Sequence, residues 1–166
     1  EISGWVAPAV TLSPDGTRLV FASIDPDGVT RLNTRRLDEA RTTEIPGTEG
    51  ARAPFLSPDG RWVGFWASGK LKKTAVDGGS PLTVCELSDI NGASWGEDDT
   101  IVAAVGSALL RIPASGGTPA VILDLSRESA RPAWPQVLAE GGMVLYTDIG
   151  FAGPDYANIE VFSPAT

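Results

Sequence analysis

The sequence contains no histidine and a single cysteine, Cys85, and these two shortages exclude much of the chemistry that a small domain can carry. Without histidine the chain lacks the commonest general base and the commonest metal ligand, and a Ser-His-Asp triad is impossible. One cysteine forms neither an intrachain disulfide nor a cysteine-rich metal cluster. We therefore expect a non-catalytic segment with no cofactor and no metal site.

Basic residues are also scarce, because 13 Lys and Arg stand against 21 Asp and Glu and give a net charge of −8. An acidic chain repels a phosphate backbone, so we expect no nucleic-acid partner. Long apolar runs are missing as well, and the first residues, "EISGWVAPAV", lack the basic start and apolar core of a signal peptide. The sequence predicts neither a membrane span nor a signal peptide. With 42% apolar and 20% charged residues, it has the composition of a folded domain.

What the sequence does contain is a repeat. Leu-Ser-Pro-Asp-Gly at 12–16 returns at 56–60, and two degraded copies follow as "WGEDD" at 95–99 and "VLAEGG" at 137–142. The first residues of these copies lie 44, 39 and 42 residues apart, at positions 12, 56, 95 and 137. This spacing is that of one propeller blade, roughly 40 to 50 residues.

Each unit contains short runs of Val, Ile, Leu, Phe and Trp that are broken by Gly, Pro, Asp and Ser, which is typical of strands and turns. In Ser-Pro-Asp-Gly, proline presets the first central position of a turn, and glycine supplies the left-handed residue that re-enters a strand. The strands are predicted at 9–13, 18–24, 30–37 and 42–45; at 53–57, 61–67, 70–76 and 82–85; and at 93–96, 100–105, 108–112 and 120–123.

Three turns per unit define a four-stranded antiparallel meander, so the predicted fold is an all-β propeller of about four blades. The predicted blades cover 8–50, 51–91, 92–132 and 133–166. The final segment, "NIEVFSPAT", is predicted to be a third strand without a fourth, which leaves the last blade incomplete. The missing strand is expected from the N-terminal "EISGWV", from a second chain or from sequence outside these residues.

The repeated Ser-Pro-Asp-Gly, together with "KLKKTAVDGGSPLTV" at 70–84 and "ALLRIPASGGTPAVI" at 108–122, resembles the TolB-type, WD-repeat-like propeller family. More narrowly, the chain resembles the propeller regions of bacterial receptor-like serine/threonine kinases. The resemblance implies a binding or sensor module, an extracytoplasmic position and rings that usually have at least six blades. Two alternatives stay open: a propeller that gates a prolyl-oligopeptidase-like hydrolase, and a purely structural scaffold.

Binding residues are expected on the loops that lead from one blade to the next, at 46–54, 86–94, 125–135 and 149–158. Arg52 and Arg131 recur in the similar contexts "ARAP" and "ARPA". They are candidates to bind an anionic ligand or an acidic peptide; the alternative is pairing with a neighbouring carboxylate between blades. Trp5 and Trp134 precede first strands and are candidate contact residues. The other tryptophans, Trp62, Trp66 and Trp95, are expected in the packing between blades.

The acidic residues of the turns are expected to stabilise the turns themselves. Asp15 and Asp59 should cap backbone N–H groups. Solvated turns are also favoured over calcium sites for 97–99 and for the pair Asp25 and Asp27, because neither has the spacing of a calcium loop. The predicted partner is a protein or peptide, or alternatively a small ligand at the channel mouth, and a homodimer that completes a ring is a further alternative.

Overall fold

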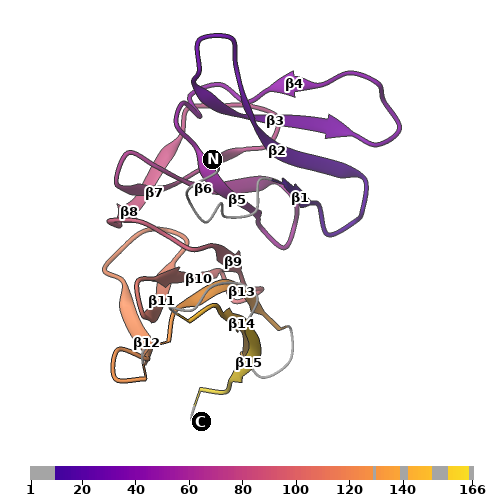
Figure 1. The fold of residues 1–166 in the computed structure, drawn as a ribbon. Helices are drawn as coiled ribbons and strands as arrows, with labels where there is room; N and C mark the ends of the chain where they lie inside the picture. The colour runs from indigo at the N-terminus through magenta and orange to yellow at the C-terminus, as the bar shows by residue number, and fades with distance from the viewer. Residues whose placement is uncertain (1–9, 129, 139–141, 151–156, 165–166) are drawn as a thin grey trace.

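The computed structural model describes residues 10–128, 130–138, 142–150 and 157–164, and these residues form four antiparallel sheets around a common centre (Figure 1). In every sheet the strands pair in chain order, so each sheet is a meander. The fold is therefore the all-β propeller predicted from the repeat. Among the described residues, no helix is long and apolar enough to span a membrane.

Each sheet is one blade. Blade 1 contains β1 (Val10–Leu12), β2 (Arg18–Ile24), β3 (Thr30–Arg36) and β4 (Thr43–Glu44). Blade 2 contains β5 (Arg52–Leu56), β6 (Trp62–Ala67), β7 (Lys70–Ala75) and β8 (Leu82–Glu86). Blade 3 contains β9 (Ala93–Trp95), β10 (Thr100–Val105), β11 (Ala108–Pro113) and β12 (Ala120–Asp124). Blade 4 contains β13 (Pro132–Val137), β14 (Val144–Asp148) and β15 (Asn158–Phe162).

The first strand of each blade faces the centre, and successive first strands touch: β1 contacts β5, β5 contacts β9, and β9 contacts β13. No contact of similar extent joins β13 back to β1 among the described strands. Within the described part of the chain, blades 1 and 4 are therefore the two end blades of the array. In blade 4, β15 is the third strand that the sequence predicted; the N-terminal segment proposed as its neighbour lies outside the described residues.

The Ser-Pro-Asp-Gly turns have the geometry that their residues dictate. Gly16 takes the left-handed conformation with φ of 71°, and the carboxylate of Asp15 accepts hydrogen bonds from the Ser13 hydroxyl and from the Thr17 N–H at 3.0 Å. These hydrogen bonds lower the pKa of Asp15 to about 2. The carboxylate of Asp59 accepts a hydrogen bond from the Arg61 N–H in the same way, so the predicted capping role is confirmed.

Each blade has two faces, which we name by the neighbour that they meet. The leading face packs on the preceding blade and is represented in blade 2 by Leu56, Val63 and Phe65, which join a cluster with Val20 and Leu32 of blade 1. The trailing face packs on the following blade and is represented in blade 2 by Phe55, Trp66 and Leu71. The predicted interblade role of the tryptophans is confirmed, because Trp95 is buried in this second interface and Trp62 and Trp66 pack against it.

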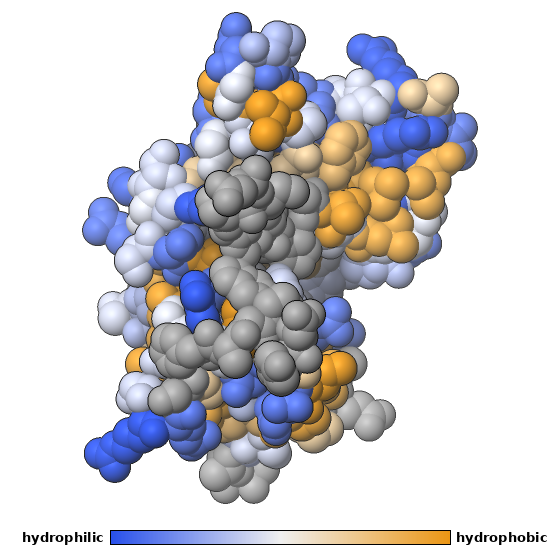
Figure 2. All heavy atoms as spheres, in the orientation of Figure 1, coloured by the Kyte–Doolittle hydropathy of each residue, from blue (hydrophilic) through white to orange (hydrophobic). Residues whose placement is uncertain are grey.

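Apolar side chains stay exposed at the two ends of the array. Figure 2 shows them gathered over β1 and β2 and again beside β15. They include Val10 and Leu12 at one end and Ile159 and Val161 at the other, all at least half exposed.

Candidate functional site

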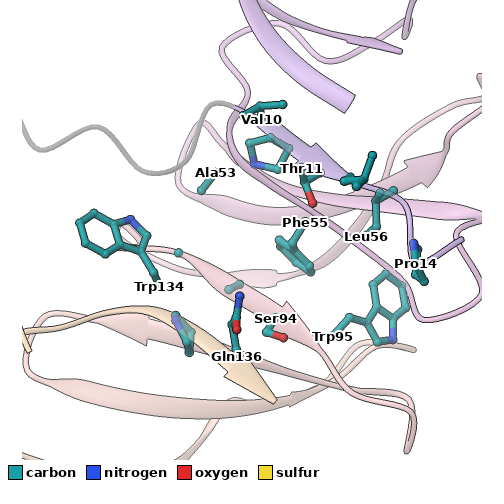
Figure 3. Close-up of a pocket in the computed structure, with 15 residues that line it drawn as sticks. Val10, Thr11, Pro14, Ala53, Phe55, Leu56, Ser94, Trp95, Trp134 and Gln136 are labelled. Atoms are coloured by element: carbon teal, nitrogen blue, oxygen red, sulfur yellow. The ribbon is translucent and has the colours of Figure 1, made fainter. Parts of the chain in front are cut away.

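A cavity of about 260 Å³ lies at the centre of the array, where the first strands of all four blades converge (Figure 3). None of the described residues that line it has a charged side chain, although the chain as a whole has a net charge of −8. Three polar side chains face it from different blades: Thr11, Ser94 and Gln136. The apolar walls come mainly from prolines and aromatic residues: Pro14, Pro54, Pro135, Phe55, Trp95 and Trp134.

In three of the four blades, a residue with a left-handed backbone conformation lies at or near the start of the first strand. Ala53, Gly92 and Trp134 have φ values of 52°, 113° and 49°, and each stands three residues before the end of its pairing with the second strand. The pairing of β5 and of β13 with its second strand shifts register at this residue, as in a β-bulge. All three residues line the cavity. Left-handed conformations at non-glycine residues are costly and gather at functional sites, which makes this ring of positions the candidate site.

Trp134 is fixed in place by blade 3. Its backbone N–H donates a hydrogen bond to the Asn91 carbonyl at 2.8 Å. Gly92 approaches so closely that a Cβ there would lie 3.0 Å from the Trp134 Cα. The half-buried Trp134 ring stands apart from the other aromatic residues in Figure 3, so it offers a separate apolar surface to a ligand.

The opposite wall is an aromatic pair. The rings of Phe55 and Trp95 lie 6.3 Å apart at an angle of 58°. Phe55 lies across Gly64 of the neighbouring strand, where a Cβ would meet the ring at 2.2 Å. Because Gly64 has no side chain, the Phe55 ring can lie directly against its backbone and form part of the cavity wall.

The structure places Arg52 outside the cavity. Its guanidinium carbon lies 4.3 Å from the centre of the Trp66 ring, and its Nη2 lies 3.4 Å from a carboxylate oxygen of Asp89 in the connection from β8 to β9. Both charged groups are exposed, so the pair contributes little to stability. Arg52 thus has the carboxylate partner that the alternative interpretation expected, and its role towards a ligand stays a prediction.

Arg131 does not line the cavity either. Its backbone N–H donates to the Asp148 carboxylate at 2.8 Å, and its half-exposed side chain forms no ion pair with a described carboxylate. Of the three candidates that the structure describes, Trp134 is the one found at the cavity. Trp5 lies outside the described residues.

One sequence pattern at the cavity would suggest catalysis. Residues 92–96, Gly-Ala-Ser-Trp-Gly, match the Gly-x-Ser-x-Gly pattern of serine hydrolases. In those enzymes the serine sits on a sharp turn from a strand to a helix, whereas Ser94 lies within β9. Its hydroxyl accepts a hydrogen bond from the Val137 N–H at 3.1 Å, and the chain has no histidine to activate it. Ser94 is therefore a polar wall residue that joins blades 3 and 4.

Other reactive side chains are either buried or already hydrogen-bonded or ion-paired. Burial raises the pKa of the free Cys85 thiol, which makes it a poor nucleophile. Asp25 accepts hydrogen bonds from the N–H groups of Asp27 and Val29, and Asp98 is paired with Arg111. Within the described ranges, no group of three or more His, Cys, Asp or Glu could hold a metal ion.

No protein-family model matches the sequence, and no curated protein matches it. Solved structures do match. A protein assigned as TolB from Agrobacterium tumefaciens superposes with a TM-score of 0.78 over 93% of this chain at 13% identity. TolB from Acinetobacter baumannii gives 0.73 over 96% at 14% identity. The fold is a TolB-like β-propeller.

A further match is a chain of the nidogen/laminin complex, with a TM-score of 0.65 over 93% of this chain at 14% identity. The present chain spans 60%, 44% and 62% of the lengths of these three structures, less than two thirds of each. At such identities the likeness concerns the fold. None of the three is named as a kinase, so the link to receptor-like kinases stays a prediction.

Residue-by-residue inspection of the sequence missed most of the cavity. Thr11, Phe55, Ser94 and Gln136 occupy the same place in the four blades, one residue before the last pair of the first strand. Aligning the units on Leu12, Leu56, Trp95 and Val137 would have shown three polar residues at a position that faces the centre.

Proposed function

We propose that this chain is a non-catalytic binding module that holds an uncharged segment of a partner polypeptide in its central cavity. The observation that carries this proposal is a cavity lined by all four blades, at which none of the described lining residues is charged, in a strongly acidic chain. A TolB-like propeller fits a binding or scaffold module. A scaffold alone gives no reason for an uncharged cavity lined by left-handed residues.

The size of the cavity favours a side chain over a whole small molecule. Pockets for drug-sized ligands usually have volumes of about 300 to 1,000 Å³, and this cavity has about 260 Å³. It accommodates one or two apolar or aromatic side chains against Trp134 and the Phe55–Trp95 pair. The polar groups of Thr11, Ser94 and Gln136 are available to hydrogen-bond the peptide backbone. The likeness to a chain of the nidogen/laminin complex supports a protein partner in general terms.

Arginines at or near the ends of the connections between blades would add a second set of contacts. Arg131 has a half-exposed side chain without a described carboxylate partner, so it suits an acidic group that flanks the buried segment. Arg52, already stacked on Trp66, contributes less to such a contact. A sensor role beside a kinase domain and a gating role beside a peptidase domain both depend on neighbouring domains and stay predictions.

The test is a selection of random peptides displayed on phage against the immobilised chain, followed by titration of the best synthetic peptide. We expect selected peptides with an uncharged apolar or aromatic centre. Ser94→Asp places a charge in the cavity while keeping an acceptor for the Val137 N–H, and it should weaken binding at least tenfold. The matched control, Ser80→Asp, changes an exposed serine outside the cavity and should leave binding unchanged. Selected peptides that bind both variants equally well would contradict the proposal.

A further inference from the structure

Blades 1 and 2 enclose a second cavity, of about 200 Å³, between their outer strands. Its walls include Arg18 of β2, Thr34 and Arg36 of β3, Arg41 of the connection from β3 to β4, and Val76 and Asp77 after β7. None of its lining residues lines the central cavity. We call it the arginine cavity, because three of the chain's 13 basic residues lie in its wall.

Two of these arginines form a like-charge pair. Arg18 and Arg36 are directly opposite each other across β2 and β3, so both side chains leave the same face of the sheet. Like charges at such a position are destabilising. The next residue on that face of β2, Val20, is fully buried against blade 2, so the two arginines border the packed interface. Packing gives no reason for two cations at this position, whereas an anion held between them does.

The acidic groups of the wall do not take up this positive charge completely. Three carboxylates line the cavity, and each pairs with an arginine: Asp77 with Arg18, Glu39 with Arg36, and Glu44 with Arg31. All three acidic side chains are more than half exposed, whereas the Arg18 side chain is only 19% exposed. The carboxylates therefore stand towards solvent, and the Arg18 guanidinium lies deeper between the blades.

Hydrogen-bond donors remain in surplus at the cavity. A guanidinium has five N–H donors. Arg18 donates from Nη1 to Asp77, and Arg36 donates from Nε and Nη2 to Asp38, which leaves further N–H groups on both. Arg41 forms no ion pair with a described carboxylate. A ligand that supplies several acceptor oxygens and a negative charge matches these groups.

Thr34 adds an unpaired hydroxyl. It is 8% exposed, and its hydroxyl oxygen has no hydrogen-bond partner among the described residues. Buried polar side chains almost always have such a partner. Because Thr34 lines the arginine cavity, a ligand oxygen bound there can supply the missing one.

A larger cavity of about 550 Å³ adjoins the arginine cavity and shares four of its lining residues: Arg18, Arg36, Val76 and Asp77. Its other walls include the half-buried Trp62 and the turn residues Asp15 and Asp59. Its volume lies in the range of small-molecule pockets, about 300 to 1,000 Å³. Carboxylates accept hydrogen bonds from hydroxyl groups, and a tryptophan ring offers a flat apolar surface. This cavity therefore suits the hydroxyl-bearing part of a small molecule.

We propose that the two cavities together bind a small phosphorylated molecule such as a sugar phosphate, with the phosphate in the arginine cavity and the sugar beside Trp62. A phosphate carries about 1.5 to 2 negative charges at neutral pH and has three acceptor oxygens. It matches three arginines and a hydroxyl better than a carboxylate, which has two oxygens. Arginine also binds phosphate through two parallel hydrogen bonds. This site is separate from the peptide site proposed in the central cavity.

The experiment is isothermal titration calorimetry with glucose 6-phosphate, inorganic phosphate and glucose as probes, in a buffer without phosphate. Arg36→Gln removes one guanidinium of the like-charge pair, and Thr34→Val removes the unpaired hydroxyl. The matched control, Arg127→Gln, removes the same charge from an exposed arginine that lines neither cavity. Circular dichroism checks that each variant is folded.

Glucose 6-phosphate should bind the unaltered chain and Arg127→Gln equally well, inorganic phosphate should compete with it, and glucose should not bind. Arg36→Gln should weaken binding about tenfold or more, through the loss of hydrogen bonds to a charged group. Thr34→Val should weaken it about fivefold without destabilising the unliganded chain, which a purely structural role of the hydroxyl does not explain.

No binding of glucose 6-phosphate at millimolar concentration would overturn the proposal. Equal binding to Arg36→Gln and to the unaltered chain would also overturn it, because the phosphate would then lie elsewhere. The peptide test with Ser94→Asp changes neither of these cavities, so the two proposals can fail separately.

Discussion

Gly64→Ala tests whether the cavity wall depends on a missing side chain. An added Cβ would lie 2.2 Å from Phe55 Cζ and within 2.8 Å of two further ring atoms, so the ring must move. Phe55 is buried and paired with Trp95. The open space beside its ring is the central cavity, and a ring displaced into it would lose packing on Trp95. Overpacking a core costs about 1 to 3 kcal/mol, and the lower entropy of an unfolded chain with alanine offsets about 0.4 to 1 kcal/mol. We expect a net loss of about 1 kcal/mol in the free energy of unfolding.

Urea unfolding followed by tryptophan fluorescence measures this loss, and the melting temperature should fall by about 2 to 4 °C. A double-mutant cycle with Phe55→Leu separates the clash from a general effect of alanine, since leucine lacks the ring atoms that the new Cβ would meet. In the leucine background, Gly64→Ala should cost less than about 0.5 kcal/mol. Equal costs in both backgrounds would refute the reasoning.

Three further substitutions test other parts of the structure. Thr34→Val removes a buried hydroxyl that has no hydrogen-bond partner among the described residues, and it should raise the free energy of unfolding in urea by about 1 kcal/mol; a loss of stability would contradict this. Gly92→Ala places a Cβ at φ of 113° and 3.0 Å from the Trp134 backbone; it should cost about 2 to 3 kcal/mol in the same assay, and a neutral result would show that β13 can shift. Asp15→Asn removes a carboxylate with a pKa of about 2, below its ordinary value of 3.8. The fold stabilises the charged form, so the loss relative to the unaltered chain should be complete at neutral pH and shrink as pH falls from about 4 to about 2; a pH-independent difference would contradict it.

The repeat made most of the fold predictable, because its turn residues act locally. Proline, aspartate and glycine at 14–16 set a hairpin without help from distant residues, and the strand edges predicted around it lie close to those of β1 and β2. The third strand of blade 4 also followed from the sequence, since the segment "NIEVF" was predicted as a strand and forms β15.

The site was less predictable because it depends on backbone geometry and on where the blades meet. Alanine and tryptophan give no local signal for a left-handed conformation, so the φ values of Ala53 and Trp134 are visible only in the structure. Arg52 and Arg131 shared a sequence context that suggested a common site, yet in the structure Arg52 pairs with Asp89 and neither arginine lines the cavity.

Titrating a selected peptide into the chain labelled with ¹⁵N at the tryptophan indoles tests the central claim most directly. Trp134 lines the cavity, whereas Trp66 lies under Arg52 and donates its indole N–H to the Leu87 carbonyl at 2.9 Å. Binding in the cavity predicts a saturable shift of the Trp134 indole resonance with little change at Trp66. A peptide that shifts Trp66 and leaves Trp134 unchanged would contradict the assignment of the cavity as the binding site.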